Sequence, residues 1–130
     1  MGKYAQLETD IFSIFGSAEW IAESINTYPS NFVAVNAGTE FLKVSIIPSG
    51  KGVNLRSVSG LLIVDIYIAS GSGIKRISEL ADKLDNYLEG IVSNKVQFGS
   101  SSLDILGQDK DNPALYRASY TLSFNYWSLI

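Results

Sequence analysis

Residues 60–90 decide the fold, and they read GLLIVDIYIASGSGIKRISELADKLDNYLEG. The segment from Leu61 to Ala69 is apolar and rich in β-branched residues, too short to span a bilayer and typical of a buried strand. After the glycines at 71 and 73, apolar residues recur at steps of three and four, which predicts a helix lying on a sheet. These residues are Ile74, Ile77, Ala81, Leu84, Leu88 and Ile91. Gly90 is placed to end that helix in a left-handed conformation. We therefore expect a central strand followed by a helix packed on its sheet.

A second helical pattern precedes this unit, between Tyr4 and Thr27. Its apolar face is formed by Leu7, Ile11, Ile14, Ala18, Ile21 and Ile25, widened by Phe15 and Ala22. Gly16 interrupts the pattern and Ser17 is a suitable N-cap for a new segment, so one bent helix and two short helices are both open. Pro29 is expected to end the helical region.

The remaining segments predict strands. Residues 31–36 and 40–47 are expected to form a hairpin across a turn at 36–39, and the glycine-rich loop 48–54 leads to a strand that begins near Leu55. Strands are also predicted at 95–100 and 103–106, followed by a polar turn at 107–113.

The last strand shows strict alternation over residues 116–126. One face carries Tyr116, Ala118, Tyr120, Leu122, Phe124 and Tyr126, and polar residues occupy the other. The order of elements is α-β-β-β-α-β-β-β. This order predicts an α+β fold, a mostly antiparallel or mixed β-sheet with about two main helices packed on one face.

Composition narrows the function. With 130 residues we expect a single domain, 1–130. The chain has no cysteine and no histidine, which removes disulfides, thiolate zinc sites and the commonest general base. A net charge of −3 argues against a general nucleic-acid binder. No signal peptide or membrane-spanning run is recognised, so we expect a protein made in the cytoplasm.

Two motifs that could carry chemistry are incomplete. The segment from Gly71 to Gly73 follows a strand and opens a helix, as a dinucleotide fingerprint does, but Arg76 occupies the position of the third glycine. Asp109 and Asp111 resemble part of a calcium loop but lack its glycine and distal glutamate. We therefore expect no enzyme activity, no metal and no cofactor.

The second face of the central strand is a candidate subunit interface. That face carries Leu61, Ile63, Asp65 and Tyr67. If the helices cover only the first face, the second is too apolar for ordinary wet surface, and Asp65 would limit non-specific association. An ordinary surface with scattered apolar residues is the alternative interpretation.

The arrangement resembles the tail terminator proteins of long-tailed bacteriophages, also called tail completion or tail tube terminator proteins. The resemblance covers nearly the whole chain and is carried by patterns of elements rather than by a catalytic motif. It rests on the helix with Trp20, the Asn31-Phe32 start of a hairpin, the unit from Gly60 through Gly73, the helix Ser78–Leu84, and the closing strand Tyr120–Trp127.

The resemblance implies a structural virion protein without enzyme activity. Such a protein forms a ring, expected to be hexameric, that caps the finished tail tube and presents a surface to a head-completion or connector protein. It implies a place in the virion at the head-proximal end of the tail, after assembly in the host cytoplasm. The loops bearing Lys51 and Arg56, and Asp109, Lys110 and Asp111, become candidates for contact with tube, connector or lumen, where passive contact with DNA is left open. No membrane is expected as a partner.

Two alternatives stay open. Another neck protein, such as a head-closure or adaptor ring, has a similar size and structural role. A small binding domain that holds an anionic ligand at the turn from Ser70 to Arg76 belongs to a different class.

Overall fold

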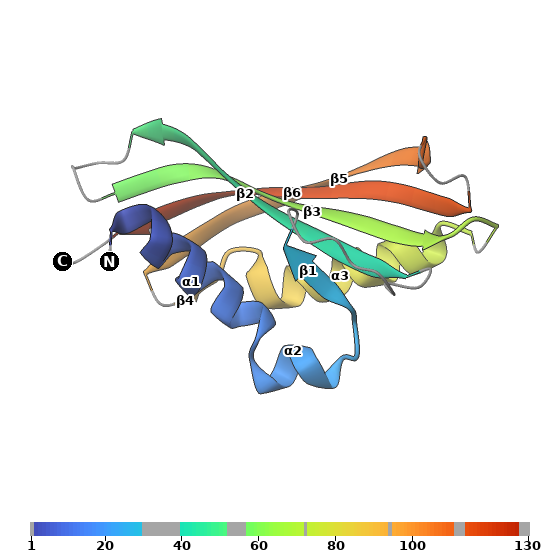
Figure 1. Ribbon diagram of the computed structural model, residues 1–130, viewed down its shortest axis with the longest axis horizontal. Helices are drawn as coiled ribbons and strands as arrows, with labels where there is room; N and C mark the ends of the chain where they lie inside the picture. Colours follow the sequence, from blue (N-terminus) through green and yellow to red (C-terminus); the bar gives the residue numbers. More distant parts are fainter. Residues whose placement is uncertain are drawn as a thin grey trace.

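The computed structural model describes residues 2–29, 40–51, 57–71, 73–93, 95–110 and 114–127. These residues form a six-stranded sheet in the order β1-β2-β3-β6-β5-β4, in which only β1 runs parallel to its neighbour. The strands are β1 (Thr27–Pro29), β2 (Phe41–Lys51), β3 (Ser57–Ala69), β4 (Val92–Ser93), β5 (Val96–Gln108) and β6 (Leu115–Trp127). The helices α1 (Lys3–Phe15), α2 (Ala18–Ala22) and α3 (Lys75–Leu88) lie on one side of the sheet (Figure 1). The predicted α+β class is confirmed.

The core lies between the helices and the middle of the sheet. In β3, the side chains of Leu62, Val64 and Ile66 have no exposed surface, as the alternation predicted. β3 pairs along its whole length with β6, whose predicted apolar face from Ala118 to Tyr126 is also buried. These residues of β3 and β6 point toward the helices. Since all described helices lie on that one side of the sheet, no described helix covers the opposite faces of β3 and β6 (Figure 1).

The helical region divides at Gly16, so the open choice is resolved in favour of two helices. The Ser17 hydroxyl accepts a hydrogen bond from the backbone N–H of Trp20 at 3.3 Å and caps α2. Trp20 is buried, its indole N–H donates to the Thr27 hydroxyl at 3.0 Å, and its ring packs edge-on against Phe15. Because Trp20 points inward, the rest of this short helix projects away from the sheet (Figure 1).

The helix α3 follows the predicted stripe between its ends, but Ile91 lies beyond the helix and Leu80, which the stripe omitted, is also buried. The helix buries Ile77, Ala81, Leu84 and Leu88, and Gly90 has the expected positive φ of 68°. Ile74, however, precedes the helix and is 55% exposed, because the glycine turn ends the strand before the helical period begins.

Two buried tyrosines of β6 hold the long helices in place. The Tyr120 hydroxyl donates to Asp85 Oδ1 of α3 at 2.5 Å, and the Tyr126 hydroxyl donates to Asp10 Oδ2 of α1 at 2.9 Å. Each bond ends on a charged acceptor, which makes it stronger than a neutral pair. Hydrogen bonds as well as apolar packing thereby hold α1 and α3 against β6.

Other boundaries differ from expectation. The two strands predicted at 95–106 are one strand, β5, with two register irregularities, and it extends to Gln108 into the predicted polar turn. Residues 27–29 form β1 rather than the end of a helix, and they pair parallel with β2. The predicted strand at 31–36 and the turn at 36–39 lie outside the described residues.

Candidate interaction surface on the open face of the sheet

The predicted interface residues lie on the face of the sheet that no described helix covers, here called the open face. Strand register brings their neighbours beside them. The open face contains Leu61, Ile63, Asp65 and Tyr67 of β3, Ile47, Ser45, Lys43 and Phe41 of β2, and Ser123, Thr121, Ser119 and Arg117 of β6. The sequence therefore placed the four residues of β3 together correctly, but these residues behave in two different ways.

One half of the open face is an exposed apolar strip formed by Ile47, Leu61 and Ile63. Leu61 is 38% exposed and its cross-strand partner Ile47 is 43% exposed. Ile63 is half-buried beside them. Sequence reasoning missed Ile47, although it continues the alternation of Phe41, Lys43 and Ser45 along the strand. Aliphatic side chains that line up across two strands are suited to contact with another protein surface.

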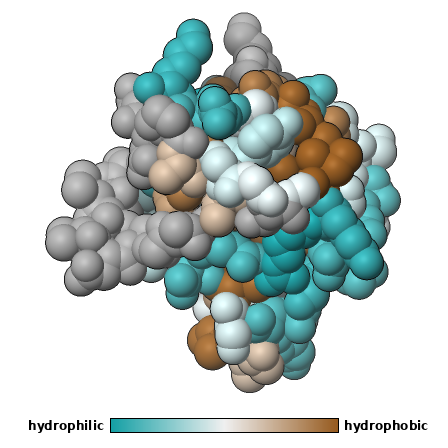
Figure 2. Space-filling view, turned by 90° about the vertical axis from the view of Figure 1, so that its right-hand side faces the viewer, coloured by the Kyte–Doolittle hydropathy of each residue, from teal (hydrophilic) through white to brown (hydrophobic). Residues whose placement is uncertain are grey.

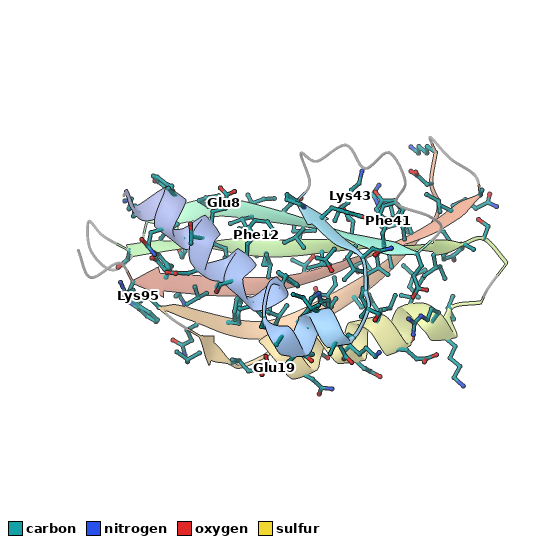
Figure 3. All side chains as sticks on the ribbon, turned by 60° about the horizontal axis from the view of Figure 1, so that its bottom comes forward. Glu8, Phe12, Glu19, Phe41, Lys43 and Lys95 are labelled. Carbon is teal, nitrogen blue, oxygen red and sulfur yellow. The ribbon has the colours of Figure 1, made fainter. Side chains whose placement is uncertain are left out.

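The other half is an aromatic cluster that is already packed. The rings of Phe41 and Tyr67 stack with centroids 4.6 Å apart and are 6% and 9% exposed, with Tyr28 against them. Lys43 Nζ lies 5.8 Å from the centre of the Tyr67 ring. Figure 3 shows Lys43 close to Phe41. Tyr67 is therefore a structural residue of the face and not one of its exposed anchors.

Asp65 is committed to a partner within the same chain. Its Oδ1 lies 3.4 Å from Arg117 Nη2, and its side chain is only 18% exposed. Burial lowers the pKa of Arg117, but the charges of Asp65 and Tyr67 outweigh this effect, so the pKa lies above its usual value. Arg117 Nε is buried without a hydrogen-bond partner among the described residues. The ion pair with Asp65 therefore stabilises the charge of Arg117, which is partly removed from water.

The two candidate loops are attached at opposite ends of the sheet. Lys51 pairs with Val58 near the end where β6 stops, whereas Asp109 donates its backbone N–H to Leu115, where β6 begins. Lys110 is exposed beside Asp109. Arg56, Asp111 and the side chain of Lys51 lie outside the described residues. Within the described residues, the two loops therefore start from points at opposite ends of the sheet.

The turn considered for an anionic ligand borders an apolar pocket. This pocket has a volume of about 300 Å³ and is lined by Ile68, Ala69, Gly71, Gly73, Ile74 and Tyr116. Arg76 is paired with Glu40 and lies 3.8 Å from Glu79, so its charge is already balanced. Carboxylates hold Arg76 and apolar side chains line the pocket, so among the described residues of this turn Lys75 is the cation that no described ion pair balances.

Among the described residues, no three Asp or Glu side chains gather in a way that would hold a metal ion. None of the helices in the described ranges is both long and apolar enough to cross a membrane.

Comparison with known proteins shows the fold alone. No family model matches the chain, and no curated protein matches its sequence. A solved structure, which carries no functional name, aligns with 98% of this chain and 94% of its own at a TM-score of 0.62 and 14% identity. At that identity the similarity supports the architecture and does not carry a function from one protein to the other.

Proposed function

We propose that this protein is a tail terminator of a long-tailed bacteriophage, a structural protein that forms a ring, expected to be hexameric, on the end of the tail tube. The ring stops tube growth and offers a surface to a head-completion or connector protein. The proposal starts from the resemblance carried by the helix with Trp20, the unit from Gly60 through Gly73 and the closing strand Tyr120–Trp127. Its location would be the virion, at the head-proximal end of the tail.

The observation that carries the proposal is the uncovered apolar strip of Ile47, Leu61 and Ile63. Helices cover only one side of the sheet in the described part of the chain, and the strip lies on the other side. Such a strip is stabilised when a protein surface covers it, since apolar area removed from water contributes about 25 cal/mol per Å². A contact between different surfaces, repeated by rotation, closes into a ring.

The test is the mass of the purified protein, measured by light scattering over a range of concentrations, alone and with isolated tail tubes. A ring alone, or monomers that assemble only at tube ends, agrees with the proposal. A monomer that ignores tubes would overturn it and direct attention to the alternative of a different class, a small binding domain that holds an anionic ligand at the turn from Ser70 to Arg76.

Leu61→Glu makes the test specific to the open face. The substitution places a charge in the strip at an exposed position, so the monomer should fold while assembly is lost. Tyr4→Glu is the matched control, because Tyr4 is also exposed but belongs to α1 on the helical side. Equal assembly of the two variants would exclude the strip as an interface. A head-closure or adaptor ring would pass the scattering test but would bind connectors rather than tube ends.

A further inference from the structure

The tip of α2 is an exposed apolar projection. Ile21 is 64% exposed, with Glu19 exposed on the same helix. The inward turn of Trp20 forces this arrangement, because successive residues of a helix point about 100° apart. Figures 1 and 2 show α2 as the part of the molecule farthest from the sheet, with hydrophobic surface at the lower tip. One exposed isoleucine is ordinary by itself, so its meaning depends on whether the chain offers a site that fits it.

The apolar pocket beside the β3–α3 turn is such a site. Gly71 and Gly73 have φ values of 88° and 81°, and a Cβ added at either would meet nothing within 4 Å. Both glycines line the pocket, and L side chains rarely adopt their positive φ values, so glycine is favoured at these two positions of its rim. Ile74 extends the apolar lining to the surface, where it is 55% exposed.

The sheet continues this apolar area away from the turn. Ile105 is 44% exposed and pairs with Ala118, so it points to the same side of the sheet as Tyr116. An exposed apolar side chain of β5 therefore lies on the same side of the sheet as the pocket.

The charges around the two sites are opposite. Lys75 follows Ile74 directly, is exposed and takes part in none of the ion pairs described. The α2 tip carries Glu19, and Glu23 lies one turn further on, 3.9 Å from Lys83. An isoleucine beside an acid on one surface and an apolar pocket beside a lysine on another are complementary in apolar character and in charge.

We infer that the α2 tip of one copy inserts Ile21 into the apolar pocket of a second copy, with Glu19 facing Lys75. The inference rests on the proposed ring and adds a contact that the open face does not supply. The tip projects from the bottom of the molecule in Figure 1, whereas the turn lies at its right-hand end, so one copy offers both halves in different directions. Such a contact relates successive copies by a rotation and closes into a ring when that rotation divides a full turn.

A disulfide trap tests the contact directly, because the natural chain has no cysteine. The variant Ile21→Cys/Ile74→Cys is oxidised and separated on a non-reducing gel. Copies in the inferred contact bring the two thiols within bonding distance. The result expected is a series of linked species that ends at the mass of the ring. Tyr4→Cys/Ile74→Cys is the control, since Tyr4 is 59% exposed on the same side of the sheet. Linkage no greater than in this control, or than in the single-cysteine variants, overturns the inference.

A charge exchange gives an independent readout. Glu19→Lys and Lys75→Glu should each weaken self-association about two- to fivefold, as an exposed ion pair would, and the double variant should restore it. Losses that simply add in the double variant count against the pairing.

The two proposals fail in different ways. If Ile21→Glu forms rings of normal mass that Leu61→Glu does not form, the α2 contact is wrong and the ring stands. If the wild type stays monomeric even with tail tubes but the disulfide trap links copies specifically, the contact is real and the terminator function fails.

Discussion

Raising the pH above 10 is expected to destabilise this protein through the two tyrosines that hold the helices to β6. Burial, with the bond to Asp10, raises the pKa of Tyr126 to about 12. Burial and the bond to Asp85 raise the pKa of Tyr120 further in the same direction. In the unfolded chain both phenols titrate near pH 10. Between these values the unfolded state has lost a proton that the folded state keeps.

The sign follows from that difference in bound protons. The contribution of Tyr126 is fully present below about pH 10, falls by about 1.4 kcal/mol per pH unit, and is lost as the pH rises through about 12. Tyr126 has no exposed surface, and a folded-state pKa of about 12 against about 10 in the unfolded chain corresponds to roughly 2–3 kcal/mol. Tyr120 adds a loss of the same sign that extends to higher pH.

The assay is urea unfolding of the wild type and of Tyr126→Phe at several pH values from about 8 to about 12, followed by tryptophan fluorescence. Phenylalanine cannot titrate, so the variant should start less stable, because the bond to Asp10 is gone, but lose stability less steeply above pH 10. The fall of wild-type stability across this range should exceed that of the variant by roughly 2–3 kcal/mol. Identical slopes in the two proteins would refute the assignment of the alkaline transition to Tyr126.

Three further changes have outcomes set by the structure. Gly60→Ala should destabilise the fold by about 1–3 kcal/mol in urea unfolding, because the new Cβ would lie 2.1 Å from the Ile47 carbonyl oxygen. Gly16→Ala should not, because a Cβ there makes only ordinary contacts of 3.7 and 3.8 Å at a φ of −92°, and equal effects of the two substitutions would contradict the close approach. Leu84→Ala should cost about 2–5 kcal/mol, measured as a lower urea midpoint, since Leu84 of α3 is fully buried against the sheet; a cost below about 1 kcal/mol would mean that α3 does not pack as described. Asp65→Lys should destabilise the monomer by about 1–3 kcal/mol, because it replaces the partner of a partly buried arginine with a second cation, whereas Asp104→Lys at an exposed position of the same face should leave the urea midpoint nearly unchanged.

The result expected for Asp65→Lys alters the choice of position at which the open face should be probed. The sequence alone predicts that Asp65→Lys weakens assembly without disturbing the monomer. The structure pairs Asp65 with Arg117, so loss of assembly in that variant would be confounded with loss of folding. Leu61 is the better position, because its side chain is exposed and holds no polar partner in place.

Local periodicity determined the elements and their faces. The alternation in β3 and β6 assigned their buried and open faces correctly, and the change of period after Gly73 placed α3, because the direction of a side chain follows from the backbone period. Gly16, Ser17 and Gly90 marked helix ends through their own backbone preferences. These signals act over a few residues and can be read without the partner strand.

Only the tertiary structure decided how exposed each residue of those faces is. Tyr67 is buried because strand pairing brings Phe41 against it, and Asp65 is neutralised because β6 places Arg117 nearby. Ile74 and Ile21 fit a helical stripe in the sequence, yet both are exposed. Ile74 precedes the first residue of α3, and in α2 the buried residue is Trp20. Contacts between residues far apart in the chain depend on register and packing, and these are properties of the assembled sheet that no local pattern contains.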